Sequence, residues 1–514
     1  MSVTKRIAFG AAASGFSRAV NIVLGLVLLP VLFHHLAKEE LGVWLLLAQT
    51  SALLFILDFG LSAVLTRRIA LAKGKSGSDP NAALSDATRG EIADLVETGR
   101  RLFLGLGILT FVISTLSGFF YLRHLHLATV SLPVVWTSWG VLCLSQALGV
   151  WGQTWNCLLN GVGYVGWDAV LGTSMQTLIL LAQIATVIFG GGLVALAAVA
   201  AVGYFAQRSV LRGFARRRRP ELFQLRGKYD GALVRGMISP SLRAWATGLG
   251  SLVALNTDQF FIASLSGVSQ LPAYRAAYLV LYNLNSLAAL FAGVSAVFIS
   301  HLWQAGELGE VHRIVVRNLR LGLGLMAAGG ACILLLGPRL FDVWLGAGNF
   351  IGYPIIAIFF VLLILETQSY VISLGSRATE DEAFAFWSLG GAGIKLVLAG
   401  ILGARYGLIG IAGSTLLGQL ATTHWYMVYR GLRRLRISLR SHFLEVLAPV
   451  AMLFILVALA VWATLSANLF ATEWQAVLGC SFIAGLILAG FYWCFVLEPN
   501  HRDRIFARWH LARQ

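Results

Sequence analysis

The chain has 514 residues, of which 58% are hydrophobic and only 12% are charged, and its mean hydropathy is +0.78. A soluble domain carries about twice that charged fraction, so the composition excludes a string of globular domains and indicates a polytopic membrane protein. The net charge of +16 would suggest nucleic-acid binding in a soluble protein. Basic cytoplasmic loops explain it here, and we expect no nucleic-acid partner.

The N-terminus places Lys5 and Arg6 before an apolar run, as a signal peptide does. Arg18 interrupts that run and the apolar character continues to Phe33, which favours an uncleaved first span. Further runs of about 20 apolar residues follow, each long enough to cross a bilayer as a helix. The predicted fold is all-α, with about fourteen transmembrane helices. The predicted spans are 9–33, 41–66, 101–122, 132–158, 165–190, 192–211, 237–263, 274–300, 318–337, 352–374, 384–403, 407–429, 445–466 and 474–497.

Basic residues in the loops predict the orientation, because cytoplasmic loops carry an excess of Lys and Arg. Of the 39 basic residues, four lie in loops of one side and four lie inside or at the edge of spans, so the other 31 belong to the opposite side. That side holds the N-terminus, the RRRR run at 216–219 and the C-terminal tail. We therefore expect both termini in the cytoplasm. The loop 67–100 belongs to the same side, and its acidic residues at helical spacing predict a short amphipathic helix.

Spans 1–2 and 7–8 share a layout that indicates an internal repeat. Each first member carries an arginine near its start, Arg18 or Arg243, and each second member ends in a small-residue stretch, FGLSAVL or FAGVSAVF. Two pseudo-symmetric six-helix lobes plus two C-terminal helices fit this pattern, and repeats of transporters place the substrate path between them. We predict an N-terminal lobe over 1–211, a basic cytoplasmic linker over 212–236, a C-terminal lobe over 237–430, a basic cytoplasmic loop over 431–444, and spans 13 and 14 with a cytoplasmic tail over 445–514.

Several motifs of enzymes are absent or lack their context. The stretch NGVGYVGWD contains G-x-G-x-x-G, but a dinucleotide site needs a preceding strand, and this stretch is expected to be a turn between two spans. No Walker A lysine motif occurs, and the His34-His35 pair lacks acidic or cysteine ligands for a metal. We expect no enzyme activity, no metal site and no cofactor.

Charged and polar residues inside spans are the candidates for function, because such groups are costly in a bilayer unless they face a wet cavity or a partner. Local ion pairing and snorkelling are the structural alternatives. For Asp58 a structural role at the Gly60 bend and a role in an inner gate both stay open. The candidates for a cationic cavity that binds an acidic group are Arg18, Arg243, Arg275 and Lys395, and those for a polar lining or gate are Asn21, Asp58, Asp258, Glu366 and Tyr370.

Four stretches together resemble one family. These are SGFSRAVNIVLGLVLLPVLFHHLAKEELGVW, LDFGLSAVLTRRIA, LNTDQFFIASLSG followed by AYRAAYLV, and IKLVLAGILGARYGLIGIAGSTLLGQ. In order and spacing they resemble the polysaccharide flippases of the O-antigen, Wzx-type branch of the multidrug/oligosaccharidyl-lipid/polysaccharide (MOP) exporter superfamily. The resemblance covers most of residues 9–430.

The resemblance implies two six-helix lobes in a V, with a cationic cavity for a diphosphate and its sugars, to which Arg18 and Arg275 would contribute. It implies a flippase of the bacterial inner membrane that moves an undecaprenyl-diphosphate-linked glycan to the periplasmic leaflet. Membrane lipids, a glycan polymerase and a chain-length regulator are the expected partners. Alternatives are a multidrug/cation antiporter, a lipid II flippase, and a non-transporting assembly partner of a polymerase. Because no nucleotide site exists, H⁺ or Na⁺ coupling is expected, with Asp58, Asp258 or Glu366 as candidate carboxylates.

Overall fold

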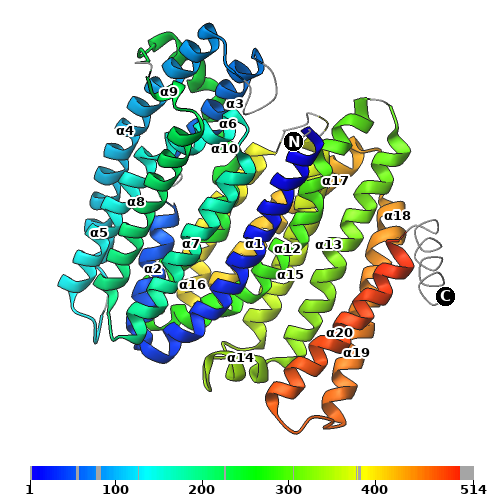
Figure 1. The fold of residues 1–514 in the computed structure, drawn as a ribbon. Coiled ribbons are helices and arrows are strands. Elements are labelled where there is room, and N and C mark those ends of the chain that lie inside the picture. The colour runs from blue at the N-terminus through cyan, green and yellow to red at the C-terminus, as the bar shows by residue number, and fades with distance from the viewer. Residues whose placement is uncertain are drawn as a thin grey trace, which may run out of the picture. The chain divides into compact units, whose positions relative to one another are not determined.

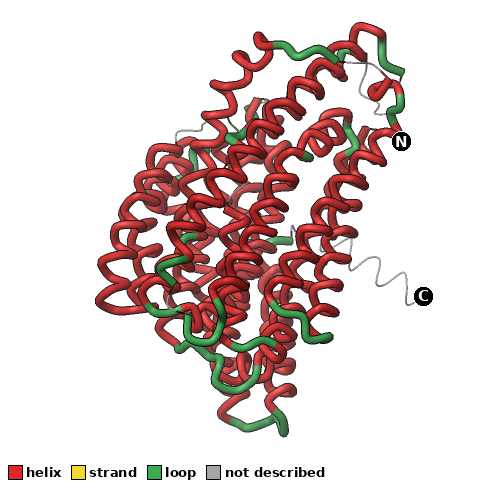
Figure 2. Tube along the Cα trace, turned by 90° about the vertical axis from the view of Figure 1, so that its left-hand side faces the viewer, coloured by secondary structure: helices red, strands yellow, loops and turns green. Residues whose placement is uncertain are grey.

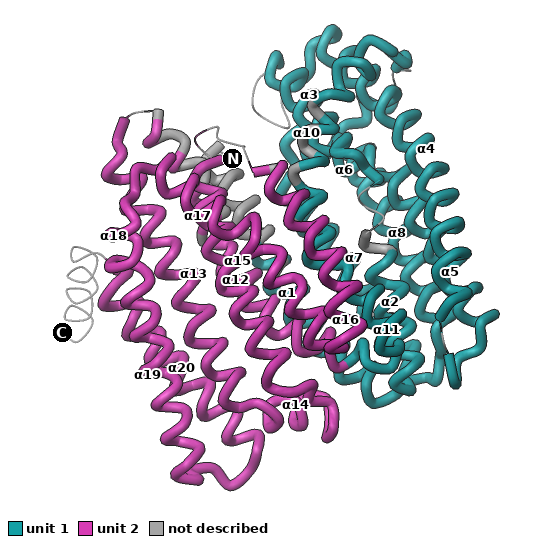
Figure 3. The backbone as a smooth tube through the Cα atoms, turned by 180° about the vertical axis from the view of Figure 1, so that it is seen from behind, with its two compact units in different colours: residues 1–272 teal, residues 273–514 magenta. Residues whose placement is uncertain are grey.

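The computed structural model describes residues 3–53, 57–76, 83–125, 127–224, 227–304, 306–377, 379 and 384–497. In these residues every regular element is a helix, as predicted, and none is a strand (Figure 2). The chain divides into two compact units, Met1–Pro272 and Ala273–Gln514 (Figure 3). Helices over 231–265 belong to the first unit, whereas the sequence assigns them to the second lobe. The predicted lobe boundaries and the V therefore stay predictions.

The first unit consists of helices of very different lengths (Figure 1). Its elements are α1 (Val3–His35), α2 (Lys38–Leu53), α3 (Leu61–Gly74), α4 (Asp86–Leu122), α5 (Leu132–Trp151), α6 (Gln153–Val162), α7 (Val165–Ile188), α8 (Leu193–Arg218), α9 (Glu221–Gln224), α10 (Gly231–Asn256), α11 (Asp258–Leu265) and the 3₁₀ turn η2 (Val268–Gln270). Helices α4, α5 and α8 pack side by side, and α1 packs along α7.

The predicted second span, 41–66, is interrupted. Helix α2 ends at Leu53 and α3 begins at Leu61, and the turn before α3 has positive φ at Phe59 (49°) and Gly60 (73°). Glycine suits such a conformation because it has no Cβ. A Cβ at position 60 would also lie 2.5 Å from the carbonyl oxygen of Ser241 on α10. The glycine of the LDFG stretch thus permits both the turn and the close approach of α10.

Two further predicted spans are broken and one is extended. The span 132–158 divides at Gly152 into α5 and α6, and the span 237–263 divides at Thr257 into α10 and α11. The expected amphipathic helix of the loop 67–100 is the first part of α4, which continues from Asp86 into the third span. Ser85 caps α4 by accepting a hydrogen bond from the backbone N–H of Thr88.

A buried cluster holds the first unit together around α3. Leu65 and Ile69 of α3 are fully buried, as are Ile92 and Phe103 of α4. Residues of α6 and α8 complete the cluster. Because α3 lies in the middle of this cluster, the turn at 57–60 fixes the position of a buried helix.

The second unit begins in a long helix and ends in two antiparallel ones (Figure 1). Its elements are α12 (Leu271–Gln304), α13 (Leu308–Leu336), α14 (Pro338–Leu345), α15 (Tyr353–Arg377), α16 (Ala385–Ala421), α17 (Thr423–Arg434), α18 (Leu439–His442), the π-helical turn η3 (Phe443–Leu447), α19 (Ala448–Ser466) and α20 (Glu473–Phe495). Gly407 has φ 57° and ψ −135° and reverses α16. The two halves of α16 pack on each other, since a Cβ at Gly418 would lie 3.0 Å from the Gly391 carbonyl oxygen.

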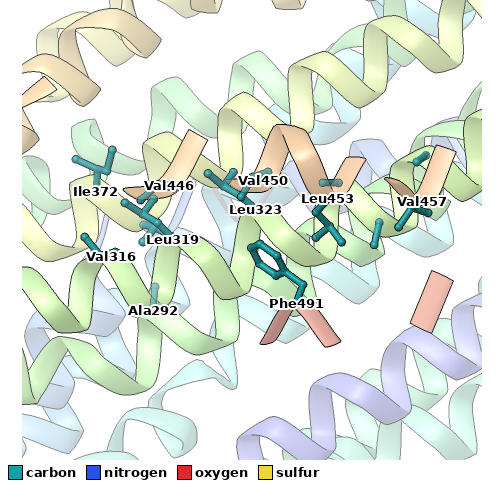
Figure 4. Packing of buried hydrophobic residues seen from close by; sticks show 14 of the residues in the cluster. Ala292, Val316, Leu319, Leu323, Ile372, Val446, Val450, Leu453, Val457 and Phe491 are labelled. Carbon is teal, nitrogen blue, oxygen red and sulfur yellow. The ribbon is translucent and has the colours of Figure 1, made fainter. Parts of the chain in front are cut away.

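The core of the second unit lies where α13, α15, α19 and α20 meet. Leu319 and Val457 are fully buried there, and Phe491 of α20 inserts between α13 and α19 (Figure 4). In a bilayer such helix contacts derive from close packing, since lipid is as apolar as the core. The C-terminal pair α19–α20 is thus a packed part of this unit.

The lengths and composition of the helices agree with a membrane protein. Within the described residues, ten helical segments are long and apolar enough to cross a membrane. One of them, 386–434, passes through the reversal at Gly407 and covers two predicted spans. Many large apolar side chains of these segments are exposed, for example Ile108 and Phe111 of α4, as expected for helices that face lipid. The number of fourteen spans remains a prediction.

Candidate functional site

Three of the predicted site residues lie on long helices of the first unit. Arg18 and Asn21 are part of α1, and Arg243 is part of α10. The side chain of Asn21 is exposed. The side chains of Arg18 and Arg243 lie outside the described part of the structure, so their predicted roles in a cationic cavity stay predictions.

Asp58 precedes the first turn of α3 and is held there by its own helix. Its carboxylate accepts hydrogen bonds from the backbone N–H of Ser62 at 3.3 Å and from the Ser62 hydroxyl at 3.1 Å. The first N–H groups of a helix lack partners within the helix, and the helix dipole favours a negative charge at this end. Asp58 therefore stabilises the start of α3.

Asp58 also borders a pocket of about 370 Å³ that lies between α3, α4 and α10. The described lining is mostly apolar, with Leu102, Leu106 and Met237 among its residues, and Arg101 is its basic member. One side of Asp58 is thus used in capping while another faces an apolar pocket within the first unit.

Asp258 begins α11 and is buried. Its neighbours form an amide cluster that the sequence analysis did not anticipate. Gln49 of α2 donates to the side-chain oxygen of Asn256 at 2.8 Å, and Gln259 donates to Gln49 at 3.5 Å. The break at Thr257 places Asp258 on a different helix from Arg243, although the predicted span 237–263 contains both residues.

Arg275, in the second unit, lies among aromatic rings at the start of α12. Its guanidinium carbon lies 5.6 Å from the ring centre of Tyr278, a cation–π distance. Tyr278 stacks on Tyr282 with ring centres 5.5 Å apart, and Phe359 of α15 contacts Tyr278 edge-on. The residue is therefore a cation held on an aromatic platform.

Four consecutive polar residues in the middle of α15 each bond a different helix. Glu366 accepts from Gln419 of α16 at 3.0 Å, and Thr367 accepts from Asn285 of α12 at 2.7 Å. Gln368 donates to His442 of α18 at 2.7 Å, and Ser369 hydrogen-bonds with His424 of α17 at 2.7 Å. We call residues 366–369 the α15 hub. Only Glu366 of the hub was a predicted site residue.

Lys395 is fully buried in α16, and the structure brings it close to Glu366. A Cβ at Gly418 would lie 3.0 Å from the Cβ of Lys395, and the next residue, Gln419, donates to Glu366. The reversal at Gly407 thus places both predicted residues against the same turn of α16. Tyr370, one helical turn after Glu366, has an exposed side chain.

A cationic and aromatic pocket of about 670 Å³ lies at the end of α17, and we call it the α17 pocket. The Arg434 guanidinium lies 5.0 Å from the Trp303 ring and also donates to the Thr379 carbonyl oxygen at 2.7 Å. None of the described residues that line this pocket is acidic. The described lining consists of Trp303, Tyr426, Tyr429, Arg430, Arg433, Arg434 and Arg436.

The α17 pocket is not among the predicted sites, although the sequence contains a signal for it. Tyr426, Tyr429, Arg430, Arg433 and Arg434 recur at i, i+3, i+4, i+7 and i+8, which is one face of a helix. The predicted organisation places Arg430 at the end of the C-terminal lobe and Arg433 and Arg434 in a basic loop, without a binding role. Within the residues that the structure describes, no group of three metal-binding side chains occurs.

Comparisons with known proteins identify the fold. No protein-family profile and no curated protein matches the chain. Among solved structures, the lipid II flippase MurJ in an inward closed conformation is similar with a TM-score of 0.69 and 14% identity, over 97% of this chain and all of that one. An inward-facing multidrug resistance MATE family transporter of the MOP superfamily has a TM-score of 0.59 and 14% identity, over 81% of this chain and 94% of that one.

A MOP superfamily transporter from Pyrococcus furiosus gives a TM-score of 0.54 at 13% identity, over 84% of this chain and 96% of that one. All three similar proteins are transporters or flippases rather than enzymes. The chain therefore has the fold that the lipid II flippase MurJ shares with transporters of the MOP superfamily.

Proposed function

We propose that the protein is a flippase that moves an undecaprenyl-diphosphate-linked oligosaccharide, such as an O-antigen or exopolysaccharide repeat unit, from the cytoplasmic to the periplasmic leaflet. Transport would occur by alternating access, the mechanism of repeat-built transporters. The sequence motifs in LDFGLSAVLTRRIA and IKLVLAGILGARYGLIGIAGSTLLGQ support the polysaccharide branch. The fold supports a MOP-type transporter or flippase in general.

The α17 pocket is the observation that carries the proposal. Its arginines could bind the two phosphates of a diphosphate by charge-assisted, bidentate hydrogen bonds. Its Trp and Tyr rings offer flat apolar faces beside those charges, which suits a sugar attached to the diphosphate. A pocket for organic cations would need acidic residues instead, so the pocket favours a flippase over a multidrug antiporter.

A lipid II flippase is the second candidate, because MurJ has the same fold over its whole length. Lipid-linked substrates of both kinds share a polyprenyl diphosphate, and the α17 pocket suits either of them. Coupling to H⁺ or Na⁺ is part of the proposal, with Asp58, Asp258 and Glu366 as the candidate carboxylates. Asp58 and Glu366 both accept hydrogen bonds in the structure. Protonation of either carboxylate would therefore change these hydrogen bonds.

The test is transport by the full chain in proteoliposomes that contain one candidate substrate at a time. Three arms carry an undecaprenyl-diphosphate-linked oligosaccharide, lipid II, or a cationic dye, and each is run with and without a proton or sodium gradient. We expect flipping in the first arm. Faster flipping of lipid II would identify lipid II as the substrate instead. Export of the dye alone would contradict the proposal that the protein is a flippase.

Arg433→Gln tests the pocket, with Arg440→Gln as its matched control. Both arginines are exposed and lie near each other in the sequence, but only Arg433 lines the pocket. A Lys or Arg near an anionic membrane surface contributes about 1 kcal/mol. With the same value for the diphosphate, we expect Arg433→Gln to lower the initial flipping rate roughly five-fold. Equal rates for the two variants would remove the α17 pocket from the proposed mechanism.

A further inference from the structure

A second cationic pocket lies in the first unit, and neither the predicted site nor the proposed transport uses it. It has a volume of about 740 Å³ and lies between α4, α5, α6 and α8, and we call it the α4–α8 pocket. Its charged lining consists of four arginines and one glutamate, a formal net charge of +3. The charged residues are Glu97, Arg100, Arg101, Arg208 and Arg212.

Aromatic and amide contacts fix the arginines of this pocket in place. Arg212 lies 5.3 Å from the ring centre of Trp155, and Trp155 stacks on Phe223 with ring centres 5.4 Å apart. Arg208 donates to the side-chain oxygen of Asn156, whose amide nitrogen donates to Asp168 at 2.9 Å. Two of the basic groups are thus positioned before any ligand arrives.

The one acidic residue of the lining does not balance its charge. Glu97 lies 2.9 Å from Arg101 and 3.6 Å from Arg100, so a single carboxylate serves two guanidinium groups. Arg101 also lies over the ring of Tyr229 at 5.5 Å. Arg100 and Arg212 are exposed, and both can therefore reach an anion in the pocket.

The walls of the pocket are apolar and continue onto an exposed apolar surface. Leu104, Trp151 and Phe205 line the pocket and are 48%, 39% and 54% exposed. One turn further along α4, Ile108 is 60% exposed. Side chains of this kind on a membrane-spanning unit contact acyl chains, so the pocket joins a cationic end to a lipid-facing surface.

We propose that the α4–α8 pocket binds the phosphate head group of an anionic phospholipid of the surrounding bilayer. Basic pockets between transmembrane helices on the cytoplasmic side bind such head groups, and the Lys and Arg distribution assigns this end of α4 and α8 to the cytoplasm. The acyl chains lie along Leu104 and Phe205, a contact that free phosphate cannot make. The inference depends on the pocket alone and not on the transported substrate.

The test measures lipid binding to the delipidated full-length protein by native mass spectrometry. Phosphatidylglycerol and phosphatidylcholine with identical acyl chains are titrated separately, and inorganic phosphate is added as a competitor. The variant Arg100→Gln/Arg212→Gln removes two lining charges, and its control Arg216→Gln/Arg217→Gln removes two exposed charges of α8 outside the lining. At about 1 kcal/mol for each arginine, we expect the first variant to bind phosphatidylglycerol roughly 30-fold more weakly and the control to change little.

Gly152→Ala tests the geometry without changing any charge. A Cβ at position 152 would lie 2.8 Å from Cγ of Arg208, so it displaces the stem of that arginine. Because the added atom would also lie 3.0 Å from Cβ of Arg208, we expect a lower melting temperature together with weaker binding of phosphatidylglycerol at temperatures where the variant is folded. Equal loss in the control double variant, equal binding of phosphatidylcholine, or displacement of the lipid by low millimolar phosphate would each overturn the proposal.

Discussion

Asp58 in the first unit and Glu366 in the second are both carboxylates inside apolar stretches, and the two units accommodate them differently. Asp58 lies where its span is interrupted and accepts hydrogen bonds from Ser62, four residues away. Glu366 lies inside the continuous helix α15 and accepts a hydrogen bond from Gln419, 53 residues away. One carboxylate is satisfied by a local change of backbone and the other by a separate helix.

The difference shows two ways to meet the same requirement. A buried polar group needs a hydrogen-bond partner, and leaving one unpaired costs about 1–3 kcal/mol. At Asp58 the backbone turns and exposes the N–H groups of α3, which requires positive φ at Phe59 and Gly60. At the α15 hub the backbone stays helical, and α12, α16, α17 and α18 each supply a side chain.

We expect the largest effect at Gly60, because the turn next to Asp58 depends on this one glycine. Gly60→Ala adds a Cβ at φ 73°, and this atom would lie 2.5 Å from the Ser241 carbonyl oxygen. Strained backbone and overpacking each cost about 1–3 kcal/mol, so we expect a loss of roughly 3 kcal/mol or more in the free energy of unfolding. Unfolding by SDS in mixed micelles measures it.

Gly74→Ala is the matched control, because position 74 lies on the same helix α3, has no positive φ, and leaves open space for the Cβ that alanine would add. That change should be neutral or slightly stabilising, since alanine favours a helix by roughly 0.5–1 kcal/mol over glycine. If both variants unfold alike, the turn at 57–60 does not fix the position of α3.

We expect a smaller effect when the α15 hub loses one of its hydrogen bonds. Thr367→Val keeps the shape of the side chain and removes the hydroxyl that accepts from Asn285 at 2.7 Å. Asn285 retains its bond to the Leu363 carbonyl oxygen at 3.2 Å, so the loss should be about 1–2 kcal/mol, within the range for an unpaired buried group.

Thr110→Val on α4 is the matched control for the loss of a buried threonine hydroxyl. Thr110 is as buried as Thr367, and its hydroxyl donates to the Leu106 carbonyl oxygen of its own helix at 2.7 Å, as the Thr367 hydroxyl does to Leu363 at 2.8 Å. A difference between the two variants measures the contact between α15 and α12. Equal losses of unfolding free energy would show that the contact between α15 and α12 adds no stability.

The same contrast explains what the sequence could predict. Apolar runs are local signals, and they correctly predicted an all-helical fold. The partners of the α15 hub come from residues 53 to 82 positions away, and no period in a single sequence encodes such pairs. The run Glu366-Thr367-Gln368-Ser369 was still informative, because consecutive helical positions point about 100° apart and therefore need partners on all sides.

Helix breaks were the other failure of the sequence analysis. At Thr257 no glycine or proline marks the division of the predicted span. Gly152 is a glycine within an apolar run like many others in this chain, and its distinguishing feature is the nearby stem of Arg208. Hydropathy alone does not predict where these breaks fall.

The smallest expected effect tests what determines the loss of stability when a hydrogen bond is removed: the separation of the partners in the sequence or their burial. Glu39 at the start of α2 accepts from the backbone N–H groups of Ala128 and Thr129, both at 2.6 Å and about 90 residues away. Burial acts to raise its pKa, but the hydrogen bonds from Thr129 and Ala128 outweigh burial and hold the pKa of the carboxyl below its ordinary value of 4.5. The contact is as non-local as the α15 hub, yet Glu39 is only partly buried.

Because the pKa of Glu39 is lower in the folded state, its contribution to stability is present above pH 4.5 and is lost as the pH falls through the lowered value. Glu39→Gln should cost below about 1 kcal/mol at neutral pH, since water can replace the bonds of an accessible group. Melting temperatures of the two proteins should converge as the pH falls below 4.5. A gap that stays constant with pH would assign the effect to side-chain shape, and a loss as large as that of Thr367→Val would make separation in the sequence, rather than burial, the determinant.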